Sequence, residues 1–347
     1  MTKDSFSGWR EALAAFWHPR VITMLFFGFS AGVPILLIFS TLGLWLREAG
    51  FGRSVTFFSW AALGYSFKYV WAPLVDQMPL PFLTRRLGRR RAWILASQLS
   101  IITAILWMAF IDPVSGHHHL TFMAMGAVLL GFSSATQDIV IDAYRIESAG
   151  EELQAMMAST YIAGYRIGML TAGAGALYMA EKLGSVKGAY LYSAWQTTYI
   201  TMAGIMGMGL VTTLIISEPN EGSDISKTYS ARTYARAFGV FLLAVVGFII
   251  WFTQTGTIAV ILKSALAEVV ANRHLAGFVI ESLRLIGGIG VAVLIARGTT
   301  AIGIVDREMI RATYVAPILE FFGRYGTSLA CLLLALVGLY RISDIVL

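Results

Sequence analysis

Residues 133–147 read SSATQDIVIDAYRIE, and they end a long apolar run that begins near Leu120. Asp138, Asp142 and Arg145 stand at positions i, i+4 and i+7, so a helix places them on one face. An ionised side chain in the hydrocarbon of a membrane costs roughly 3 kcal/mol or more. Two carboxylates in such a run therefore need a structural partner or a function.

The composition of the chain is that of a membrane protein. Of the 347 residues, 57% are hydrophobic and 13% are charged, whereas about a quarter of the residues in a soluble domain are charged. Apolar runs of about 20 residues, the length that spans a bilayer, recur along the whole chain. The helices of a large soluble core are shorter and amphipathic, which excludes that class. The sequence predicts an all-α polytopic membrane protein.

Nine membrane-spanning helices are expected, and strands have no place in this pattern. Most connections between the helices are short. The two longer connections, 217–236 and 297–326, are polar and are expected to form loops or surface helices. The expected spans are 21–46, 54–76, 92–111, 120–143, 156–180, 193–216, 237–262, 277–296 and 327–347.

The distribution of basic residues predicts the orientation of the chain. With a cytoplasmic N-terminus, most of the 26 lysines and arginines fall in inner segments, as the positive-inside rule requires. The net charge of +6 is therefore an orientation signal, and nucleic acid is not an expected partner. The densest basic cluster lies between the second and third spans and consists of Arg85, Arg86, Arg89, Arg90 and Arg91.

Three ionisable side chains are expected deep inside the bilayer. Lys68, Asp138 and Arg166 lie within the second, fourth and fifth spans, and Tyr65 and Tyr161 lie beside them. Two cations and one carboxylate leave a surplus of positive charge. This surplus favours a hydrated cavity that binds an anionic or polar solute and relays a proton. The alternative is a charge-compensated network that only holds the helices in register.

Asp142 and Arg145 are expected closer to the inner interface of the membrane. Their spacing of three residues fits an ion pair at a helix end. The same spacing also fits an inner gate of the cavity, so both interpretations remain open.

The loop APLVDQMPLPFLTRRLGRRRAW, residues 72–93, carries a more specific pattern. It resembles the loop between the second and third helices of major facilitator transporters, in which an acidic residue is followed by an R-x-G-R-[RK] run. Here Asp76, Arg86, Gly88, Arg89 and Arg90 match that pattern, with a longer spacer. The resemblance implies that the aspartate and the basic cluster pair across the cytoplasmic mouth as a gate.

Together with the opening stretch, this loop resembles a narrower family. FKYVWAPLVD (67–76), RLGRRRAWILASQ (86–98) and SATQDIVIDAYRIE (134–147) resemble the AmpG family of muropeptide permeases and the related acetyl-coenzyme A transporters. GFSAGVPILLIFSTLGLWLREAG (28–50) and PILEFFGRYG (317–326) fit the same family. The resemblance covers nearly the whole chain.

The resemblance implies a major facilitator fold and a proton-coupled transporter of the bacterial inner membrane. Such a transporter imports anhydromuropeptides, the products of peptidoglycan turnover, for recycling. Two six-helix halves surround one site, with two inserted helices between them. The domains implied are a six-helix bundle over 1–216, a cytoplasmic linker over 217–236, an inserted helix pair over 237–296, a second cytoplasmic linker over 297–326, and the start of the C-terminal half over 327–347.

This pattern leaves most of the C-terminal half missing from the chain. Because alternating access needs both halves around the site, the chain alone is not expected to transport, and a separate C-terminal half is a possible partner. Three alternatives stay open: a transporter of another anionic solute such as an acyl-coenzyme A, a non-transporting remnant or interaction protein, and a membrane enzyme that uses Asp138 and Asp142 as an acid–base pair.

No catalytic or cofactor motif supports the enzyme alternative. A Gly-rich phosphate loop, a zinc spacing and a nucleophile elbow are all missing from the sequence. The single cysteine, Cys331, excludes a disulfide within the chain. We therefore expect no cofactor and no metal, with the solute, protons and the lipid bilayer as partners.

Three smaller patterns predict packing. Gly164 and Gly168 form a small-xxx-small pair, which predicts a closely packed helix. Glu281 and Arg284, three residues apart in the eighth span, predict a local ion pair. The tryptophans expected to anchor the helices at the membrane interfaces are Trp45, Trp71 and Trp195.

Overall fold

A computed structural model describes residues 15–51, 65, 68–116, 118–186, 188–219 and 230–346. The described residues form helices and one isolated bridge between Val186 and Ala189, which confirms the all-α prediction for this part of the chain. Seven of the described helices are long and apolar enough to cross a membrane. The chain divides into an N-terminal unit, Met1–Ser226, and a C-terminal unit, Lys227–Leu347.

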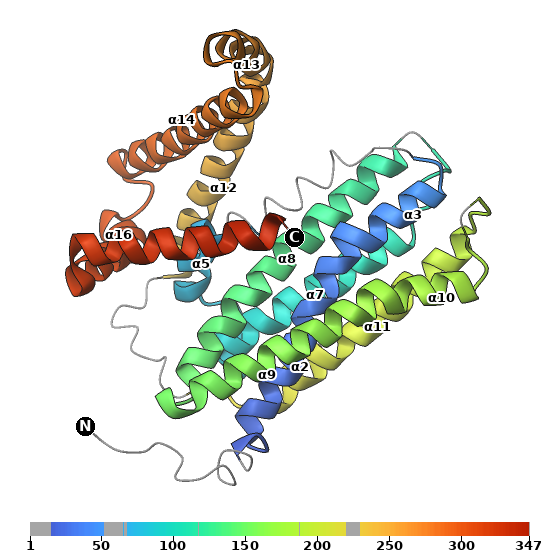
Figure 1. Cartoon of the computed structure of the whole chain (residues 1–347). Helices are drawn as coiled ribbons and strands as arrows, with labels where there is room; N and C mark the ends of the chain where they lie inside the picture. Colours follow the sequence, from blue (N-terminus) through green and yellow to red (C-terminus); the bar gives the residue numbers. More distant parts are fainter. Residues whose placement is uncertain are drawn as a thin grey trace. The chain divides into compact units, whose positions relative to one another are not determined.

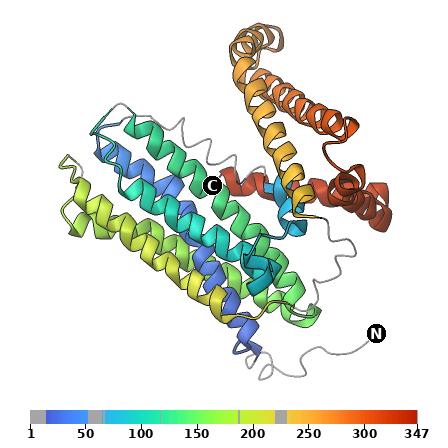
Figure 2. The ribbon, with the colours of Figure 1, turned by 180° about the vertical axis from the view of Figure 1, so that it is seen from behind.

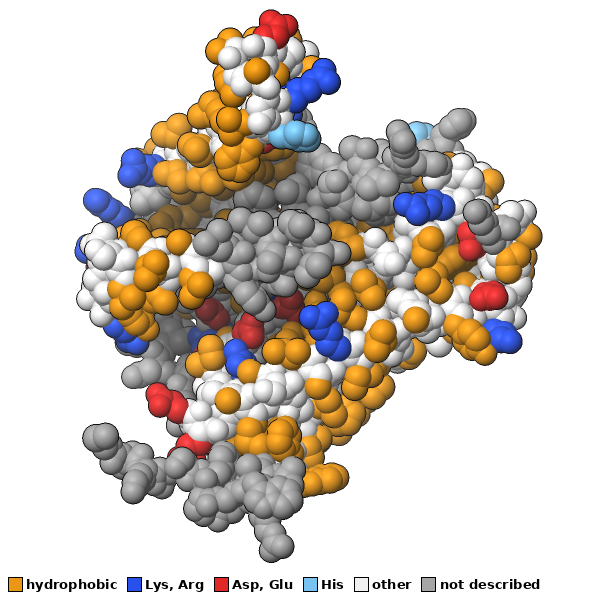
Figure 3. Space-filling view, in the orientation of Figure 1, with side chains coloured by type: hydrophobic (Ala, Val, Ile, Leu, Met, Phe, Trp, Pro, Cys, Tyr) orange, Lys and Arg blue, Asp and Glu red, His pale blue; other side chains and the backbone are white. Residues whose placement is uncertain are grey.

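The N-terminal unit is a bundle in which α2, α7, α8, α9 and α11 run side by side (Figures 1 and 2). Hydrophobic side chains line the lower right edge of this unit in the space-filling view, as expected for a surface in contact with lipid (Figure 3). The bundle consists of α2 (Pro19–Leu36), η1 (Leu37–Thr41), α3 (Leu42–Glu48), α5 (Lys68–Gln77), α6 (Leu83–Leu87), α7 (Arg89–Ala109), α8 (His119–Ser148), α9 (Glu151–Leu170), η3 (Thr171–Gly175), α10 (Ala176–Lys182) and α11 (Tyr192–Ile215).

Four glycines bring α2 and α9 into backbone contact. A Cβ at Gly164 would overlap the carbonyl oxygen of Leu25, and a Cβ at Gly168 would overlap that of Phe29. In return, Gly28 and Gly32 on α2 leave room for the backbone of α9. The close packing predicted for Gly164 and Gly168 is confirmed, and its partner is a second G-xxx-G pair.

Two π-helical turns lie opposite each other beyond these glycines. The Thr41 hydroxyl, at the end of η1, donates to the Ala172 carbonyl in η3 at 2.7 Å. The Tyr199 hydroxyl donates to the Leu37 carbonyl at 3.2 Å. A π turn leaves the α-helical ladder locally irregular, and each turn here receives a side-chain hydroxyl on one of its carbonyls.

The end of the bundle near α3 is closed by buried aromatic residues. Trp45 and Trp195 stack with ring centroids 5.7 Å apart, and both are fully buried. Trp195 Nε1 donates to Glu48 Oε2 at 2.8 Å. Trp71, on α5, is buried as well, and its indole N–H donates to Thr136 Oγ1 on α8. The prediction that these tryptophans anchor at the lipid interface is wrong, because polar partners inside the bundle take up their indole N–H groups.

Tyr190 joins the same end of the bundle from the connection before α11. Its hydroxyl accepts from Trp45 Nε1 at 3.3 Å and donates to Asp112 Oδ1 at 2.9 Å. Burial and the bond to Asp112 raise the pKa of the Tyr190 phenol, which therefore stays protonated and keeps donating.

The first part of the C-terminal unit, residues 231–301, contains three helices where the sequence analysis expected two spans. A single span over 237–262 was expected, but α12 ends at Gln254 and α13 begins at Gly256. Arg284 explains the break, because it donates to the Phe252 carbonyl and, through Nε, to Thr255 Oγ1 at 3.2 Å. The three helices are α12 (Ala231–Gln254), α13 (Gly256–Val270) and α14 (Arg273–Ala301).

The predicted Glu281–Arg284 ion pair is confirmed at 2.8 Å and forms part of a larger contact. Lys263 on α13 also pairs with Glu281, and the Arg284 guanidinium lies 4.1 Å from the centre of the Phe252 ring. This group of side chains therefore ties α12, α13 and α14 together.

The second long connection, expected over 297–326 as loops or surface helices, is mostly helical. Helix α14 continues to Ala301, and helix resumes at Arg307. Asp306 starts the new helix by accepting from the backbone N–H of Glu308 at 2.8 Å. The remaining elements are α15 (Arg307–Ile310), η5 (Arg311–Val315) and α16 (Ala316–Val346), with a kink at Gly326 in α16.

Of the second expected span, 54–76, only Tyr65 and the residues from Lys68 onward are described. The fifth expected span, 156–180, is helical from Glu151 to Lys182 through α9, η3 and α10.

Candidate functional site

Helix α8 carries a run of polar residues into the interior of the N-terminal unit. Most of this helix is covered by its neighbours, so its polar side chains face other helices instead of lipid. The fully or nearly fully buried ones are Ser133, Ser134, Thr136 and Gln137. Asp138 follows directly on this run.

Lys68 and Asp138 lie close together between α5 and α8. Lys68 Nζ is 3.9 Å from Asp138 Oδ2, and the two side chains are 11% and 13% exposed. Charges so far from water interact strongly, and each costs free energy if it loses its partner. The separation exceeds a hydrogen-bond length, so the two groups interact as an ion pair.

Aromatic hydroxyls surround this pair. The Tyr161 hydroxyl on α9 donates to Asp138 Oδ1 at 3.3 Å. Tyr65 donates to Ser134 Oγ, one turn away on α8, at 2.6 Å. The Tyr161 and Tyr165 rings lie 6.1 Å apart. The sequence-predicted residues Lys68, Asp138, Tyr65 and Tyr161 are thus brought to one region of the bundle, which we call the Lys68–Asp138 site.

Arg166 is placed differently from the other predicted site residues. Its side chain is exposed, and within the described part of the chain no ion pair or hydrogen bond joins it to Lys68 or Asp138. The geometry of α9 explains this position. Gly164 and Gly168 face α2, and a residue two positions from each points to the opposite side of the helix.

Asp142 and Arg145 form an ion pair one and two turns further along α8. Arg145 Nη2 lies 3.5 Å from Asp142 Oδ1, and the aspartate side chain is half exposed. The helix end beside them is capped by Gln154, whose Nε2 donates to the carbonyls of Arg145 and Ala149.

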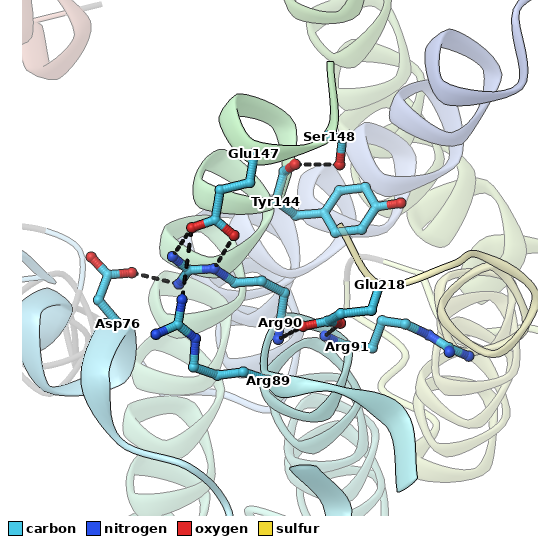
Figure 4. Close-up of polar contacts among 8 residues, drawn as sticks. All are labelled: Asp76, Arg89, Arg90, Arg91, Tyr144, Glu147, Ser148 and Glu218. Atoms are coloured by element: carbon cyan, nitrogen blue, oxygen red, sulfur yellow. Dashed lines mark hydrogen bonds and ion pairs between the residues drawn. The ribbon is translucent and has the colours of Figure 1, made fainter. Parts of the chain in front are cut away.

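A second polar group lies around Arg90 at the start of α7 (Figure 4). The Arg90 side chain is 7% exposed and lies 2.6 Å from Asp76 Oδ1. Its Nε donates to Glu147 Oε2 at 2.8 Å, and its Nη2 donates to Glu147 Oε1. Arg89 Nη2 lies 3.8 Å from the same carboxylate. A guanidinium held by two bonds to one carboxylate is among the more directional ion pairs in proteins.

Glu218 completes this group from the chain beyond α11. Its two carboxylate oxygens accept from the backbone N–H groups of Arg90 and Arg91 at 2.7 and 3.0 Å. These N–H groups belong to the first turn of α7. The N–H groups of a first turn have no acceptor within the helix, and the helix dipole favours a negative charge beside them. A Cβ at Gly88 would lie 2.6 Å from Glu218 Oε2, and the φ angle of Gly88 is +89°. The lack of space for a Cβ and the positive φ angle both explain why residue 88 is a glycine.

Further bonds join α7 and α8 to the end of α11. Arg91 donates to the carbonyls of Thr213 and Leu214 at 3.1 and 2.9 Å. The Tyr144 hydroxyl donates to the Ser217 carbonyl at 3.2 Å, and the Ser148 hydroxyl donates back to the Tyr144 carbonyl. These contacts join α5, α7, α8 and the chain after α11 at one end of the bundle. We call the residues drawn in Figure 4 the Arg90 cluster: Asp76, Arg89, Arg90, Arg91, Tyr144, Glu147, Ser148 and Glu218.

The structure brings Asp76, Gly88, Arg89 and Arg90 together, and it adds two carboxylates that the sequence analysis missed. Glu147 is the last residue of the stretch SSATQDIVIDAYRIE, and Glu218 follows α11. The sequence signal for both carboxylates was their position after the fourth and sixth expected spans, at the same end of the spans as the dense run of arginines.

Comparison with known proteins gives a consistent result. The sequence profile described as "Major Facilitator Superfamily" matches residues 21–343. The "Anhydromuropeptide permease" of Escherichia coli (strain K12) is 35% identical over 226 residues, which are 65% of this chain and 43% of that protein. "Putative transporter AmpG 4" of Rickettsia felis is 35% identical over 254 residues, or 69% and 58% of the two chains. The chain spans about half the length of the curated relatives it matches.

Proposed function

The chain belongs to the Major Facilitator Superfamily, and from this premise we propose that it takes part in the proton-coupled import of anhydromuropeptides across the bacterial inner membrane. The Lys68–Asp138 site is the observation that carries the proposal, because a paired lysine and aspartate inside a membrane bundle are costly without a function. The name of the E. coli relative supports the choice of solute.

The chemistry of the site suits such a solute. A muropeptide carries sugar hydroxyls, amides and stem-peptide carboxylates. In the proposed cycle, Asp138 takes up a proton and releases Lys68, which then binds a carboxylate of the solute. Tyr65 and Tyr161 offer hydroxyls and rings to the sugars. Arg166, exposed on α9, is a second cation along the solute pathway.

The Arg90 cluster is the proposed cytoplasmic gate. Asp76 on α5 binds Arg90, and Arg89 and Arg90 on α7 bind Glu147 on α8. Gly88 leaves room for Glu218, which caps the start of α7. The pair of Asp142 and Arg145 lies between this cluster and the Lys68–Asp138 site along α8 and belongs to the same gate. This assignment places the N-terminus in the cytoplasm and agrees with the positive-inside rule.

A second half completes the proposed transporter. Transport by alternating access takes place between two halves that surround one site. We assign residues 1–216 to the first half, 237–296 to inserted helices and 327–347 to the start of the second half. The rest of that half comes from a longer chain or from a separate protein. The greater length of the relatives supports this assignment.

Uptake by proteoliposomes tests the proposal. The chain is reconstituted alone and together with a C-terminal half, and entry of radiolabelled anhydromuropeptide is measured with and without an inward-directed proton gradient. We expect gradient-driven uptake when both halves are present. Equal uptake with and without the proton gradient overturns the proposed proton coupling. Uptake of labelled acetyl-coenzyme A in place of the muropeptide overturns the choice of solute.

A further inference from the structure

The five arginines within residues 85–91 divide into two groups. Arg89 and Arg90 bind carboxylates of the Arg90 cluster, and the Arg91 side chain donates to backbone carbonyls at the end of α11. Arg85 and Arg86 lie on the short helix α6 and are exposed. Within the described part of the chain, neither of these two forms an ion pair. The gate therefore does not account for them.

Phe82 lies directly before these two arginines in an unusual backbone conformation. Its φ and ψ angles are 65° and −45°, and the Leu83 N–H donates to the Pro81 carbonyl at 2.8 Å. This is a γ-turn with positive φ, a rare and strained conformation for a residue with a side chain. The turn leaves the Phe82 ring 81% exposed. A strained residue that presents an aromatic ring to its surroundings suggests a binding role.

The segment is held in place from both sides, so the exposed ring and the two cations have a defined arrangement. The Thr84 hydroxyl accepts from the Leu80 N–H at 2.9 Å, and Trp93 Nε1 donates to the Met78 carbonyl at 2.7 Å. A surface cavity lies at this segment. It is lined by Phe82, Leu83, Arg85, Arg86 and Leu87.

The position of α6 indicates what this surface meets. The helix ends at Leu87, and the membrane span of α7 begins at Arg89. The segment therefore lies at the boundary between hydrocarbon and headgroups, where aromatic rings are favoured. Cations at this depth attract the phosphates of anionic lipids. We infer that Phe82, Arg85 and Arg86 form a binding site for an anionic phospholipid, with the ring among the upper acyl carbons and the guanidinium groups on the phosphate.

Native mass spectrometry of the purified chain tests the inference. Phosphatidylglycerol and phosphatidylcholine are titrated separately onto wild-type protein and onto Arg85→Gln/Arg86→Gln. We expect wild type to prefer phosphatidylglycerol and the double variant to lose roughly 30-fold in affinity for it. Arg20→Gln is the control, because Arg20 is exposed in the first turn of α2 and lies outside the proposed site. This variant should bind as wild type does.

Two further variants distinguish the contribution of the arginine charges from that of the inserted Phe82 ring. Arg85→Lys/Arg86→Lys keeps the charge, so it should retain most of the preference for phosphatidylglycerol. Phe82→Ser should weaken the binding of both lipids, because the inserted ring serves either headgroup. The inference is overturned if wild type binds the two lipids equally, or if Arg85→Gln/Arg86→Gln keeps its preference. Loss of the preference in Arg20→Gln as well would indicate a diffuse effect of net charge and would also overturn it.

Discussion

Arg90 on α7 donates to both carboxylate oxygens of Glu147 on α8. The sequence pattern of the loop pointed to Asp76 as the partner of the basic cluster, and Asp76 is indeed bound. Glu147, however, makes the two-bonded contact with the guanidinium, and it lies on a helix that the loop pattern does not include. The gate proposed for this family member is therefore a junction of three helices, α5, α7 and α8.

Replacing Glu147 by Gln tests the strength of this junction. The change leaves the buried Arg90 with one carboxylate fewer, and breaking a buried ion pair from one side costs about 3–5 kcal/mol. We expect a clear drop in the melting temperature of the purified protein in detergent. Glu152→Gln is the control, because Glu152 is exposed in the first turn of α9. Equal melting temperatures for the two variants would show that the Glu147 contact adds little to stability.

Gly88 offers a test of why the family pattern has a glycine at this point. Gly88→Ala forces a side chain into a backbone with φ of +89° and pushes the Glu218 carboxylate from the two N–H groups it caps. We expect a loss of about 2–4 kcal/mol from strain and lost capping together. Gly50→Ala is a matched control for the strain, since Gly50 shares the φ of +89° and a Cβ there meets no other described residue within 4 Å.

The two glycine variants are compared by thermal unfolding. The excess loss in Gly88→Ala over Gly50→Ala measures the contact with Glu218. Adding Glu218→Ala to each background refines this measurement, because the second change should cost less where Gly88→Ala has already displaced the carboxylate. Additive losses would disprove the coupling between Gly88 and Glu218.

The close contact between α2 and α9 predicts opposite effects on stability for alanine at two glycines, one inside the contact and one outside it. A Cβ at Gly164 overlaps backbone atoms of α2, which have no rotamer through which to yield, so the helices must separate. Gly204 lies in α11, and a Cβ there meets no other described residue within 4 Å. We expect Gly164→Ala to destabilise the bundle and Gly204→Ala to leave it unchanged or stabilise it by up to about 1 kcal/mol. Chemical unfolding in mixed micelles compares them, and similar midpoints would contradict the contact.

These comparisons show what the sequence could and could not predict. Hydrophobic run length located the apolar helical segments, although it merged α12 and α13 into one, and the spacing of Gly164 and Gly168 identified a packed face. Neither signal identifies the partner helix, so Gly28 and Gly32 were missed. The tryptophans were misplaced for a related reason. A run of apolar residues has no polar stripe to show which side faces lipid, so Trp45 and Trp195 could not be assigned to the interior.

The candidate site was predictable only in part. Charges inside apolar runs pointed to Lys68 and Asp138, which the structure brings together. The same reasoning grouped Arg166 with them, although its direction around α9 depends on which face packs against α2. Depth in the membrane can be estimated from a sequence, but the angular position of a side chain needs the packing of the whole bundle.

The last prediction concerns the proposed proton acceptor. Asp138→Asn removes the titrating group and leaves the buried Lys68 without its carboxylate, so we expect uptake of anhydromuropeptide to stop responding to the proton gradient. The double variant Lys68→Gln/Asp138→Asn removes the unpaired charge as well. The double variant also lacks the lysine proposed to bind the solute, so its uptake is expected to be weak, and the informative quantity is whether the remaining uptake responds to the gradient. If the aspartate only balances the lysine, the double variant recovers stability and its remaining uptake still responds to the proton gradient. If the aspartate carries the proton, the double variant recovers stability, but its remaining uptake does not respond to the gradient. Reconstituted uptake and melting temperature, measured on both variants with Glu320→Gln as an exposed control, distinguish these outcomes.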